Sequence, residues 1–529
     1  MTTDEIGRSV VIGVDIGTTS TKAVAFDRTG GICGSAMAGY PLLEPAPGYA
    51  EQEPLRILEA AIAAMGDCAR DVAADGRKIA AWSFSGAMHA LVGIGSDGRA
   101  LTPLVTWADT RARQQAARLR SEPAAIAVYR RTGTPIHPMS PLVKLVWYRE
   151  VEPQLFAQVR RWVGVKEFVL HGLCGEWIID HSVASATGLF NLLERRWDEG
   201  ALACAGIDAG TLSRLVPVDY ASLRLRPSIA DAIGVAVDIP LVVGGADGPL
   251  ANLGVGALRP GVAACSMGTS GAFRVTVDRP VIDEAGQLFC YVLDEANWVV
   301  GGATNNAGAA LAWVAEMLAP HVDAQASDVT ALELAALAPP GSGGLVMLSY
   351  LFGERAPAWD PFASGAYVGL TRAHRREHLI RAAFEGVCQQ LALVAESLDG
   401  VEISLNEVRA TGGLTRSPFV RQLLADVLGR PVGFPVGHEG SAYGAALIGM
   451  RSIGVIGDLY EVVDAIVGGP EVVHDATNSA LYRELRSIHR ATYAALAPSM
   501  RTLQGIEAST AQPGADHLVR VPPSGSGSS

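Results

Sequence analysis

The feature that most constrains the fold of this chain is a short pattern that occurs twice. Residues 10–27, VVIGVDIGTTSTKAVAFD, place two apolar runs on either side of a small, hydroxyl-rich turn, which predicts a β-hairpin. Residues 261–278, GVAACSMGTSGAFRVTVD, repeat the apolar run, the Gly-Thr-Ser turn, the second run and a closing aspartate, at a constant offset of 251 residues. The sequence therefore predicts a duplicated fold in which two hairpin turns face each other across a cleft.

Both turns have the composition of a phosphate site. Glycine lets the backbone approach a phosphate closely, turn amides can point at an anion, and the hydroxyls add donors. Asp15, which Ser266 replaces in the second copy, can hold a magnesium ion, and Lys22 supplies a counter-charge. An ordinary Gly-Thr hairpin turn is the alternative for either copy alone. The repetition favours one polyphosphate shared by both turns, with the metal mainly on the first side.

Length and charge limit what the chain can be. A chain of 529 residues is long enough for two or more domains. With 42 Lys and Arg against 54 Asp and Glu, the net charge is -12, which argues against nucleic acid and acidic membrane surfaces as partners. The N-terminal MTTDEIGRSV does not fit a signal peptide, and we find no transmembrane run. Seven scattered cysteines without a CxxC pair favour reduced thiols over zinc or disulfides, so we expect a cytoplasmic protein.

Two segments place side chains that could line a substrate pocket. A strand over 78–84 is predicted to deliver Met88 and His89 at its carboxyl end, the edge at which α/β folds bind ligands. The loop RTGTPIHPMSP then holds His137 and Met139 on a proline-rich, rigid connection that enters a helix near residue 141. The alternative is that Met88 is a core residue and His89 a hydrogen-bonded turn residue.

The segment LVTWADTRARQ carries Trp107, Asp109 and Arg111 just ahead of a polar helix. An indole can cover a sugar face while a carboxylate and a guanidinium bind hydroxyls or another carboxylate, so this composition suits a polyol. The alternative is that Asp109 caps the helix and Arg111 is solvated.

LVVGGADGPLANLG, from residue 241, predicts a buried strand that ends in glycines and then presents Asp247 at the start of a helix. A carboxylate at a strand end, with no partner nearby in the sequence, suits a base that takes a proton from a hydroxyl. The alternative is that Asp247 only caps the helix.

The second half provides a candidate nucleotide site. VRATGGLTRSPF predicts a strand, a double glycine and a helix from about Ser417, and the turn at Gly412 and Gly413 would leave a flat face for a nucleobase. A GxxxxGK[ST] loop is absent, and GVGALRP lacks the third glycine of a dinucleotide fingerprint. We divide the chain into a first domain over 10–258, a second over 260–455, a helical extension over 456–500, and a tail over 501–529 expected to be disordered.

Two long segments resemble the signatures of the FGGY family of carbohydrate kinases: MSPLVKLVWYRE, residues 139–150, and GAYVGLTRAHRREHLIRAAFE, residues 365–385. The resemblance runs from about residue 10 to about residue 455. Within the family, DIGTTSTKA, SFSGAMHAL, TWADTRA, RTGTPIHPMSPL, ASATGLFN and ERAPAWD are more similar to gluconokinases than to xylulokinases or glycerol kinases. The resemblance implies an α/β fold of two ribonuclease-H-like, actin/hexokinase-like domains around a central cleft. It also implies ATP-dependent, magnesium-dependent phosphorylation of a sugar or sugar acid.

The resemblance also implies roles for individual residues. Asp15 is expected to hold the metal, and Asp247 matches the family's catalytic base. The residues expected to bind ATP are Gly17, Thr18, Thr19, Ser20, Lys22, Gly268, Thr269, Ser270, Gly308, Gly412, Gly413 and Ser417. The residues expected to bind the substrate are Met88, His89, Trp107, Asp109, Arg111, His137, Met139 and Asp247.

The function that these expectations favour is transfer of the ATP γ-phosphate to the C6 hydroxyl of D-gluconate. Gluconate is an anion, and Arg111, His89 and His137 are the candidates that could meet its carboxylate. A kinase for another sugar, such as D-xylulose or L-ribulose, is the nearest alternative. An ATP-binding actin-fold protein without enzymatic activity would need the turns but neither the base nor the pocket. The expected partners are a sugar acid and ATP, and a homodimer is left open.

Overall fold

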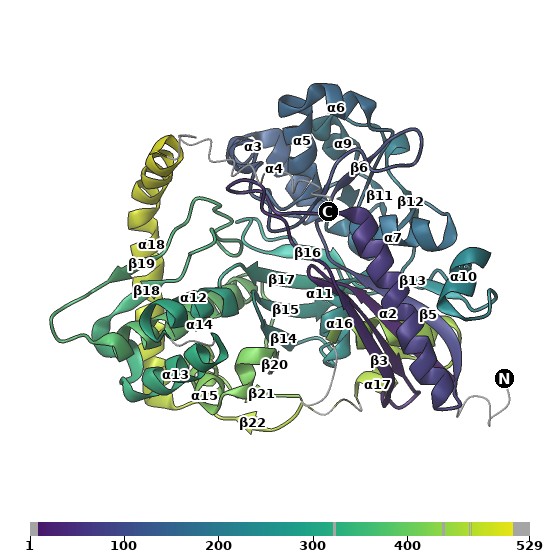
Figure 1. The fold of residues 1–529 in the computed structure, drawn as a ribbon. Coiled ribbons are helices and arrows are strands. Elements are labelled where there is room, and N and C mark those ends of the chain that lie inside the picture. Colours follow the sequence, from purple (N-terminus) through teal and green to yellow (C-terminus); the bar gives the residue numbers. More distant parts are fainter. Residues whose placement is uncertain (1–8, 321–323, 436–439, 465, 467, 511–529) are drawn as a thin grey trace, which may run out of the picture.

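Two α/β domains lie side by side, each built on one large mixed sheet (Figure 1). The computed structural model describes residues 9–320, 324–435, 440–464, 466 and 468–510. Most of the N-terminal half lies on the right and upper side of Figure 1, and most of the C-terminal half lies on the left.

The first sheet has the strand order β13-β5-β1-β2-β3. Its first three strands, β1 (Ser9–Ile16), β2 (Ser20–Phe26) and β3 (Ile32–Gly39), form an antiparallel meander, and β1 and β2 are the first predicted hairpin. Strands β5 (Lys78–Gly86) and β13 (Leu241–Ala246) then add in parallel to β1. The carboxyl ends of the three parallel strands therefore meet at the edge that carries the first hairpin turn.

The second sheet repeats this arrangement, with strand order β16-β17-β15-β14-β20-β21-β22. Strands β14 and β15 are the second predicted hairpin, β17 continues antiparallel, and β20 adds in parallel to β14. The predicted duplicated fold is thereby confirmed. The strands are β14 (Val262–Met267), β15 (Gly271–Val277), β16 (Phe289–Val292), β17 (Trp298–Thr304), β20 (Glu407–Thr411), β21 (Val432–Gly433) and β22 (Glu471–Val472).

The two hairpins differ in the length of their turns. In the first, Asp15 lies opposite Lys22. In the second, Ser266, which corresponds to Asp15, lies opposite Ala272, whereas a constant offset of 251 residues would place Phe273 there. The second turn is therefore one residue shorter than the first.

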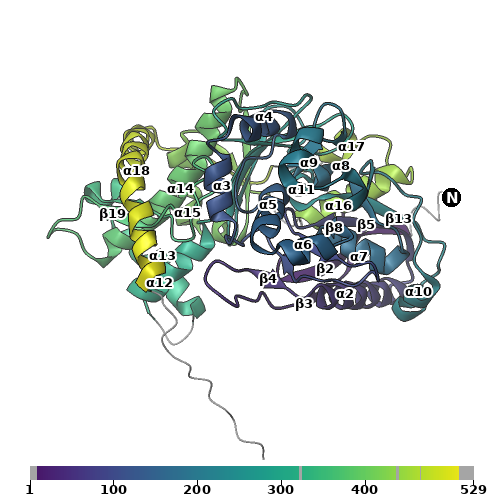
Figure 2. The ribbon, with the colours of Figure 1, turned by 90° about the horizontal axis from the view of Figure 1, so that it is seen from above.

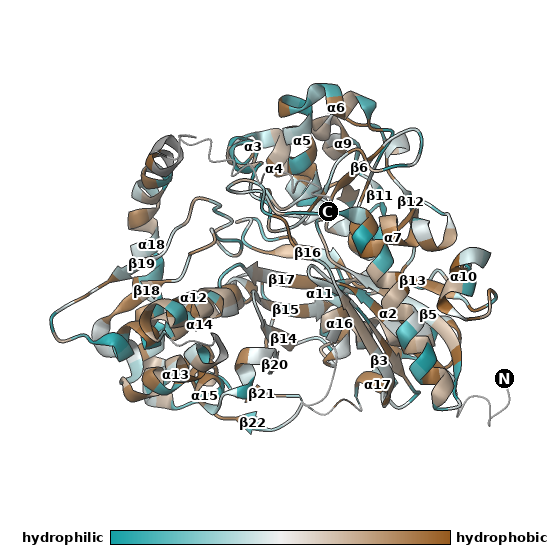
Figure 3. Cartoon of the chain, viewed as in Figure 1, coloured by the Kyte–Doolittle hydropathy of each residue, from teal (hydrophilic) through white to brown (hydrophobic). Residues whose placement is uncertain are grey.

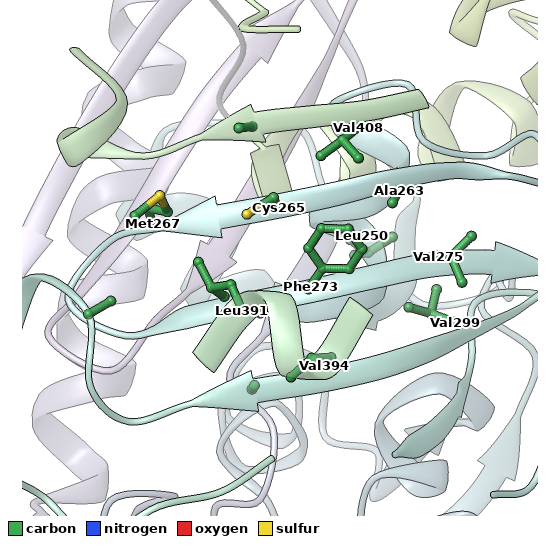
Figure 4. Close-up of a cluster of buried hydrophobic side chains, with 14 of the residues drawn as sticks. Leu250, Ala263, Cys265, Met267, Phe273, Val275, Val299, Leu391, Val394 and Val408 are labelled. Atoms are coloured by element: carbon green, nitrogen blue, oxygen red, sulfur yellow. The ribbon is translucent and has the colours of Figure 1, made fainter. Parts of the chain in front are cut away.

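This one-residue difference decides which way the side chains of β15 point, because a register slip of one residue exchanges the two faces of a strand. A constant offset aligns Arg274 with Ala23, whose side chain packs in the same core as helix α2 (Pro54–Ala74). In the actual register Arg274 corresponds to Val24, on the opposite face. Phe273 instead points to the helix-covered face of the second sheet, where Figure 4 shows it beside residues of α14 (Arg376–Gly400).

Two helices cross between the sheets. Helix α11 (Asp247–Gly254) follows β13 of the first sheet and contacts β15 and β17 of the second. Helix α16 (Gly440–Ser452) belongs to the second half of the sequence but packs on β1 and β5 of the first sheet. The contact is close, because a Cβ atom at Gly13 of β1 would lie 1.9 Å from Ala442 O. The site is therefore built on elements that are locked together across the domain boundary.

We expect Gly444→Ala to lower the free energy of unfolding by about 1 to 3 kcal/mol, because it overpacks this crossing. A Cβ atom at Gly444 of α16 would lie 2.0 Å from Leu250 O of α11, and backbone atoms cannot move aside singly. Chemical denaturation measures the change. Gly400→Ala is the matched control, because Gly400 is also helical but has no atom within 4 Å of its added Cβ. Equal stability of the two variants would contradict the prediction.

The N-terminal half also forms an upper lobe around α3–α6 and α9, with its own core that includes Val143, Val146 and Trp162 (Figure 1). The remaining elements of this half are β4 (Glu51–Gln52), β6 (Val92–Ile94), β7 (Leu104–Val105), α3 (Arg113–Leu119), α4 (Pro123–Thr132), α5 (Pro141–Val151), α6 (Pro153–Gln158), β8 (Arg161–Val163), α7 (Val165–Cys174), β9 (Ile178–Asp180), α8 (His181–Ser185), β10 (Phe190–Asn191), β11 (Arg196–Trp197), α9 (Glu199–Ala205), η1 (Ala209–Thr211), β12 (Arg214–Val216) and α10 (Pro227–Ile233).

Helices α12–α15 belong to the second domain, and α14 packs on β15 and β17. Figure 3 shows brown and pale colours along the strands of both sheets, with teal on outward turns of α2 and α6. The remaining elements of this half are α12 (Gly308–Leu318), α13 (Ala324–Leu337), η2 (Pro340–Gly344), β18 (Val346–Leu348), β19 (Ala366–Val368), η3 (Gly413–Arg416), α15 (Pro418–Leu428), α17 (Leu459–Val463) and α18 (Ala476–Thr510).

The long helix α18 lies along the outer side of the second domain, against α14, α15 and β18 (Figure 2). It continues to residue 510, so residues 501–510 are helical and the expectation of a disordered tail from residue 501 is corrected. Part of the reason is tertiary, because Arg501 forms an ion pair with Asp360 at 3.1 Å. Residues 511–529, the rest of the expected tail, lie outside the described residues.

Candidate functional site

A cavity of about 1010 Å³ lies between the two hairpin turns. The first turn contributes Thr18 and Thr19, and the second contributes Gly268, Thr269 and Ser270. The two repeated turns therefore open into one space, as the duplication predicts. Other lining residues come from the first-domain loops, from the face of the second sheet that meets α11, and from second-domain loops. They include Glu44, Tyr49, Met88, His89, Trp107, Met139, Asp247, Arg274, Phe289, Tyr291, Asn305, Phe352, Arg355, Trp359 and Gly412.

Two hydrogen bonds hold the first hairpin turn in place. Gly17 N–H donates to Ser20 O at 3.0 Å, which closes the turn. Trp107 Nε1 donates to Thr18 Oγ1 at 2.8 Å, so the indole links the loop after β7 to the first turn. Ser20 and Lys22 lie at the start of β2 and are not among the lining residues.

The second turn rests on the start of α12. Gly268 N–H donates to Ser270 O at 3.1 Å, and Gly308 N–H donates to Gly268 O at 2.8 Å. A Cβ atom at Gly308 would lie 2.7 Å from Gly268 O. Gly308 is therefore required for close packing beneath the turn and does not line the cavity.

The expected nucleobase segment reaches the cavity only in part. Gly412 lines it, with φ of 111° in the left-handed region that favours glycine. Gly413 begins the short helix η3, and Ser417 precedes α15; neither is among the lining residues.

Asp15 lies one residue before the end of β1, behind the first turn. Its Oδ2 accepts a hydrogen bond from Ser441 Oγ of α16 at 2.7 Å. Asp15 is also close enough to Asp247 for its charge to raise the pKa of the Asp247 carboxyl. A carboxylate near the end of β1 and a carboxylate directly after β13 therefore lie near each other beside the two hairpin turns.

Asp247 is the first residue of α11, and Ala246 takes the cap position, so the helix-cap alternative does not account for this carboxylate. The backbone N–H of Gly248 donates to Asp247 Oδ1 at 2.8 Å. Burial, and then the charge of Asp15, raise the pKa of Asp247 to about 6, against the lowering effect of Arg274. Such a carboxylate is ionised at neutral pH and can accept a proton from a hydroxyl in the cavity.

His89 lines the cavity as a neutral ring. Its Nδ1 lies 2.7 Å from Ala186 O, which fixes Nδ1 as the donor and leaves Nε2 as an acceptor for a substrate hydroxyl. Burial, and then the charge of Lys144, lower the pKa of His89 to about 3. Lys144 Nζ in turn donates to His89 O at 2.6 Å and Thr106 O at 2.7 Å, which holds together the loops that carry His89 and Trp107.

Three expected substrate residues do not line the cavity. Arg111 forms ion pairs with Asp109 and Glu51, and its guanidinium lies 3.9 Å from the ring centre of Tyr49. The charges of Arg111 and Asp109 are thereby compensated behind the cavity wall. Their contact with the substrate therefore stays a prediction, which this arrangement does not favour. The sequence did not reveal the cluster, because Glu51, which completes it, is distant in the sequence.

His137 is buried behind Trp359, with 5.8 Å between the ring centroids. Burial, and then the charge of Arg355, lower the pKa of His137 well below its usual range. His137 is not among the lining residues and its imidazole is neutral, so its contact with a substrate carboxylate stays a prediction that this arrangement does not favour.

Sequence reasoning missed the two arginines that do line the cavity. Arg274 lies in the second repeated hairpin, and Arg355 in the loop LFGERAPAWDP, of which ERAPAWD was noted only for its resemblance to gluconokinases. The signal for Arg274 was a lone cation within an apolar strand segment. The face of the strand to which its side chain points, however, depends on the length of the hairpin turn. The signal for Arg355 was the polar loop itself.

In one cavity, the carboxylate of Asp247 can act as a base beside two Gly-Thr turns that can bind phosphates. This is the arrangement that phosphoryl transfer requires. The models of the FGGY family of carbohydrate kinases match this chain over residues 10–254 for the N-terminal domain and 263–453 for the C-terminal domain. The chain belongs to this family, and it is accordingly a phosphotransferase with an alcohol group as acceptor.

Within this family, the chain is similar to several individual carbohydrate kinases. The gluconokinase of Bacillus subtilis (strain 168) is 39% identical over 470 residues, which cover 87% of this chain and 90% of that protein. The structure of gluconate kinase from Lactobacillus acidophilus matches with a TM-score of 0.87 and 33% identity, over 94% of this chain and 99% of that one. The ligand-bound xylulose kinase from the same organism matches with a TM-score of 0.88 and 33% identity, over 94% and 100%.

The described part of the chain contains no helix with the length and apolarity needed to cross a membrane.

Proposed function

We propose that this protein transfers the γ-phosphate of ATP to the C6 hydroxyl of D-gluconate and so forms 6-phospho-D-gluconate. The observation that carries the proposal is Asp247, a partly buried carboxylate whose pKa is raised to about 6, in a cavity that both Gly-Thr turns line. The hydroxyl oxygen forms a bond to the γ-phosphorus, the bond from that phosphorus to the ADP oxygen breaks, and the hydroxyl proton passes to Asp247.

In this proposal the two turns bind the phosphates of ATP. Thr18, Thr19, Thr269 and Ser270 offer hydroxyls and backbone amides to the cavity from opposite sides. Lys22, Gly413 and Ser417, which do not line the cavity, are proposed to reach the nucleotide only after the domains close around it.

Magnesium is proposed to bind at Asp15. Among the described residues no group of three His, Cys, Asp or Glu side chains could hold a metal by itself. Mg²⁺ is commonly bound through one or two carboxylates together with substrate phosphates, so a single carboxylate behind a phosphate turn fits it. When bound, the ion would neutralise charge on the phosphates, while Ser441 Oγ orients Asp15 through its 2.7 Å hydrogen bond.

Gluconate is favoured as the substrate by the 39% identity to a gluconokinase over most of both chains. The second candidate is a pentulose such as D-xylulose, because the xylulose kinase structure matches this chain with the same 33% identity as the gluconate kinase structure. Both candidates use the same base and the same turns, and they differ in whether the substrate is charged.

The test is ADP release by the purified protein with ATP and Mg²⁺ against D-gluconate, D-xylulose, L-ribulose and glycerol. Turnover that depends on gluconate, with a kcat/KM at least tenfold above that of any neutral sugar, supports the proposal. Preference for a pentulose would keep the kinase chemistry and reject gluconate as the substrate.

We expect kcat/KM for gluconate to fall as the pH drops below about 6, by about tenfold per pH unit, because Asp247 must be ionised to accept the proton. Above about pH 7 this limb should be flat. Burial also raises the pKa of Glu354, to about 7, so Glu354 could cause a similar fall in kcat/KM. The fall is assigned to Asp247 if the residual activity of Asp247→Asn no longer shows it. A constant kcat/KM between about pH 7 and pH 5 would contradict the role of Asp247.

A cytoplasmic location, where ATP is available, is proposed together with this activity. The homodimer left open by the sequence stays a prediction, which sedimentation of the purified protein tests.

A further inference from the structure

One face of the cavity carries three buried donor atoms without a hydrogen-bond partner among the described residues. They are Arg274 Nε on β15, Tyr291 Oη on β16 and Arg355 Nε on the loop after β18. All three residues line the cavity. An unpaired buried donor is costly, and a group of them aimed into one space indicates an acceptor that binds there.

Arg274 is held next to the base. A Cβ atom at Gly248, the residue after Asp247, would lie 3.5 Å from Arg274 Nε. The guanidinium therefore packs against the first turn of α11, in the direction that the shorter second hairpin turn imposes. The side chain of Arg274 forms no ion pair or hydrogen bond within the part of the chain that the structure describes.

Arg355 and Tyr291 are fixed in place by neighbouring groups. Arg355 is 8% exposed, donates from Nη2 to Thr304 O at 2.8 Å, and lies 4.6 Å from the ring centre of Trp107. Tyr291 stacks on Phe289 with 4.3 Å between ring centroids. Both side chains are therefore ordered before a ligand arrives, which reduces the entropy lost on binding.

The charges on this face do not balance. Two guanidinium groups line the cavity, and the carboxylate beside Arg274 is that of Asp247. The other carboxylate among the lining residues, Glu44, is exposed on a first-domain loop, and His89 is neutral. Arg111, by contrast, already has two carboxylate partners. The two guanidinium groups, whose Nε atoms have no partner among the described residues, fit a substrate that carries one negative charge and a planar pair of acceptor oxygens.

We propose that Arg274, Arg355 and Tyr291 bind the carboxylate of a sugar-acid substrate. Arg274 supplies Nε and Arg355 the second guanidinium, while Tyr291 Oη donates the third hydrogen bond. This inference rests on the proposed function, and it replaces Arg111, His89 and His137 as candidates for the carboxylate partner.

The test measures binding of D-gluconate and of a non-hydrolysable ATP analogue by calorimetry, for the whole protein and for Arg274→Met. We expect the Kd for gluconate to rise by about 10²-fold in Arg274→Met, because a charged partner is lost in a desolvated site. The Kd for the ATP analogue should stay within about threefold, which also shows that the variant is folded. Tyr291→Phe should weaken gluconate binding by about tenfold, as expected for one hydrogen bond to a charged group.

Arg111→Met is the matched control, since Arg111 is equally an arginine near the cavity but does not line it. The fold-change in its gluconate Kd should be at least tenfold smaller than the fold-change in Arg274→Met. D-Glucitol, with a hydroxyl in place of the carboxylate, provides the second control. The preference of the protein for gluconate over glucitol should fall by about 10²-fold in Arg274→Met.

The inference is overturned if Arg274→Met binds gluconate normally, or if it loses gluconate and glucitol equally. It is also overturned if the variant loses the ATP analogue instead, since Arg274 would then serve the phosphates. If the unaltered protein neither binds nor phosphorylates gluconate, the proposed function itself has failed, which is a separate result.

Discussion

Asp247→Asn should lower kcat for gluconate phosphorylation by between about 10² and 10⁴, the usual contribution of a general base. Asparagine has the same shape and can still accept the hydrogen bond that Gly248 N–H donates at 2.8 Å. It cannot take up the proton of the substrate hydroxyl. The loss should therefore appear in kcat, with the KM for ATP little changed, in steady-state assays at about pH 7.5.

Asp426→Asn is the control for this substitution. Asp426 is a buried aspartate, 3% exposed, that accepts hydrogen bonds from Gln422 and from Asp475 at the start of α18, outside the cavity. Its kcat should stay near that of the unaltered protein even if its stability falls. Near-normal turnover of Asp247→Asn would remove Asp247 from the mechanism.

Lys166→Met should lower the free energy of unfolding by about 3 to 5 kcal/mol, the cost of leaving one member of a buried ion pair without its partner. Lys166 and Asp180 are both buried, with 2.6 Å between Nζ and Oδ2. Lys166 Nζ also donates to Val243 O at 3.1 Å and Gly245 O at 2.9 Å, on the strand that leads to Asp247. Chemical denaturation measures the loss of stability, and kcat should fall with it.

Two further variants separate the ion pair from the loss of packing. Lys166→Met combined with Asp180→Asn should recover part of the stability, because the asparagine leaves no buried charge and can still cap α8, as Asp180 Oδ1 does for Val183 N–H at 2.9 Å. Lys144→Met is the matched control, since Lys144 is buried but donates to backbone carbonyls. A loss in Lys166→Met no larger than in Lys144→Met would show that the ion pair contributes nothing.

Local sequence pattern was sufficient for the elements that carry the site. The two hairpins, the strand that ends before Met88 and the helix that begins at Asp247 all follow from apolar runs bounded by glycine or proline. Of the predicted substrate residues, Met88, His89, Trp107, Met139 and Asp247 line the cavity. Each follows or flanks a strand end, and strand ends converge in a parallel sheet.

Charged residues were predicted less well. Arg111 was expected to meet the substrate, but Glu51 and Asp109 neutralise it, and Glu51 lies sixty residues away in the sequence. His137 was expected to be available, but Trp359 of the other domain covers it. The burial and the partners of a charge come from other elements, so local pattern cannot reveal them.

The sequence by itself determined that this chain is a duplicated α/β protein with two glycine-hydroxyl turns, and that an aspartate starts a helix between them. Those features depend on neighbouring residues and on the period of apolar side chains. The tertiary structure decided which cations reach the cavity. A second turn shorter by one residue exchanges the faces of β15 and turns Arg274 from the helix α14 toward α11 and the cavity, because side chains alternate along a strand.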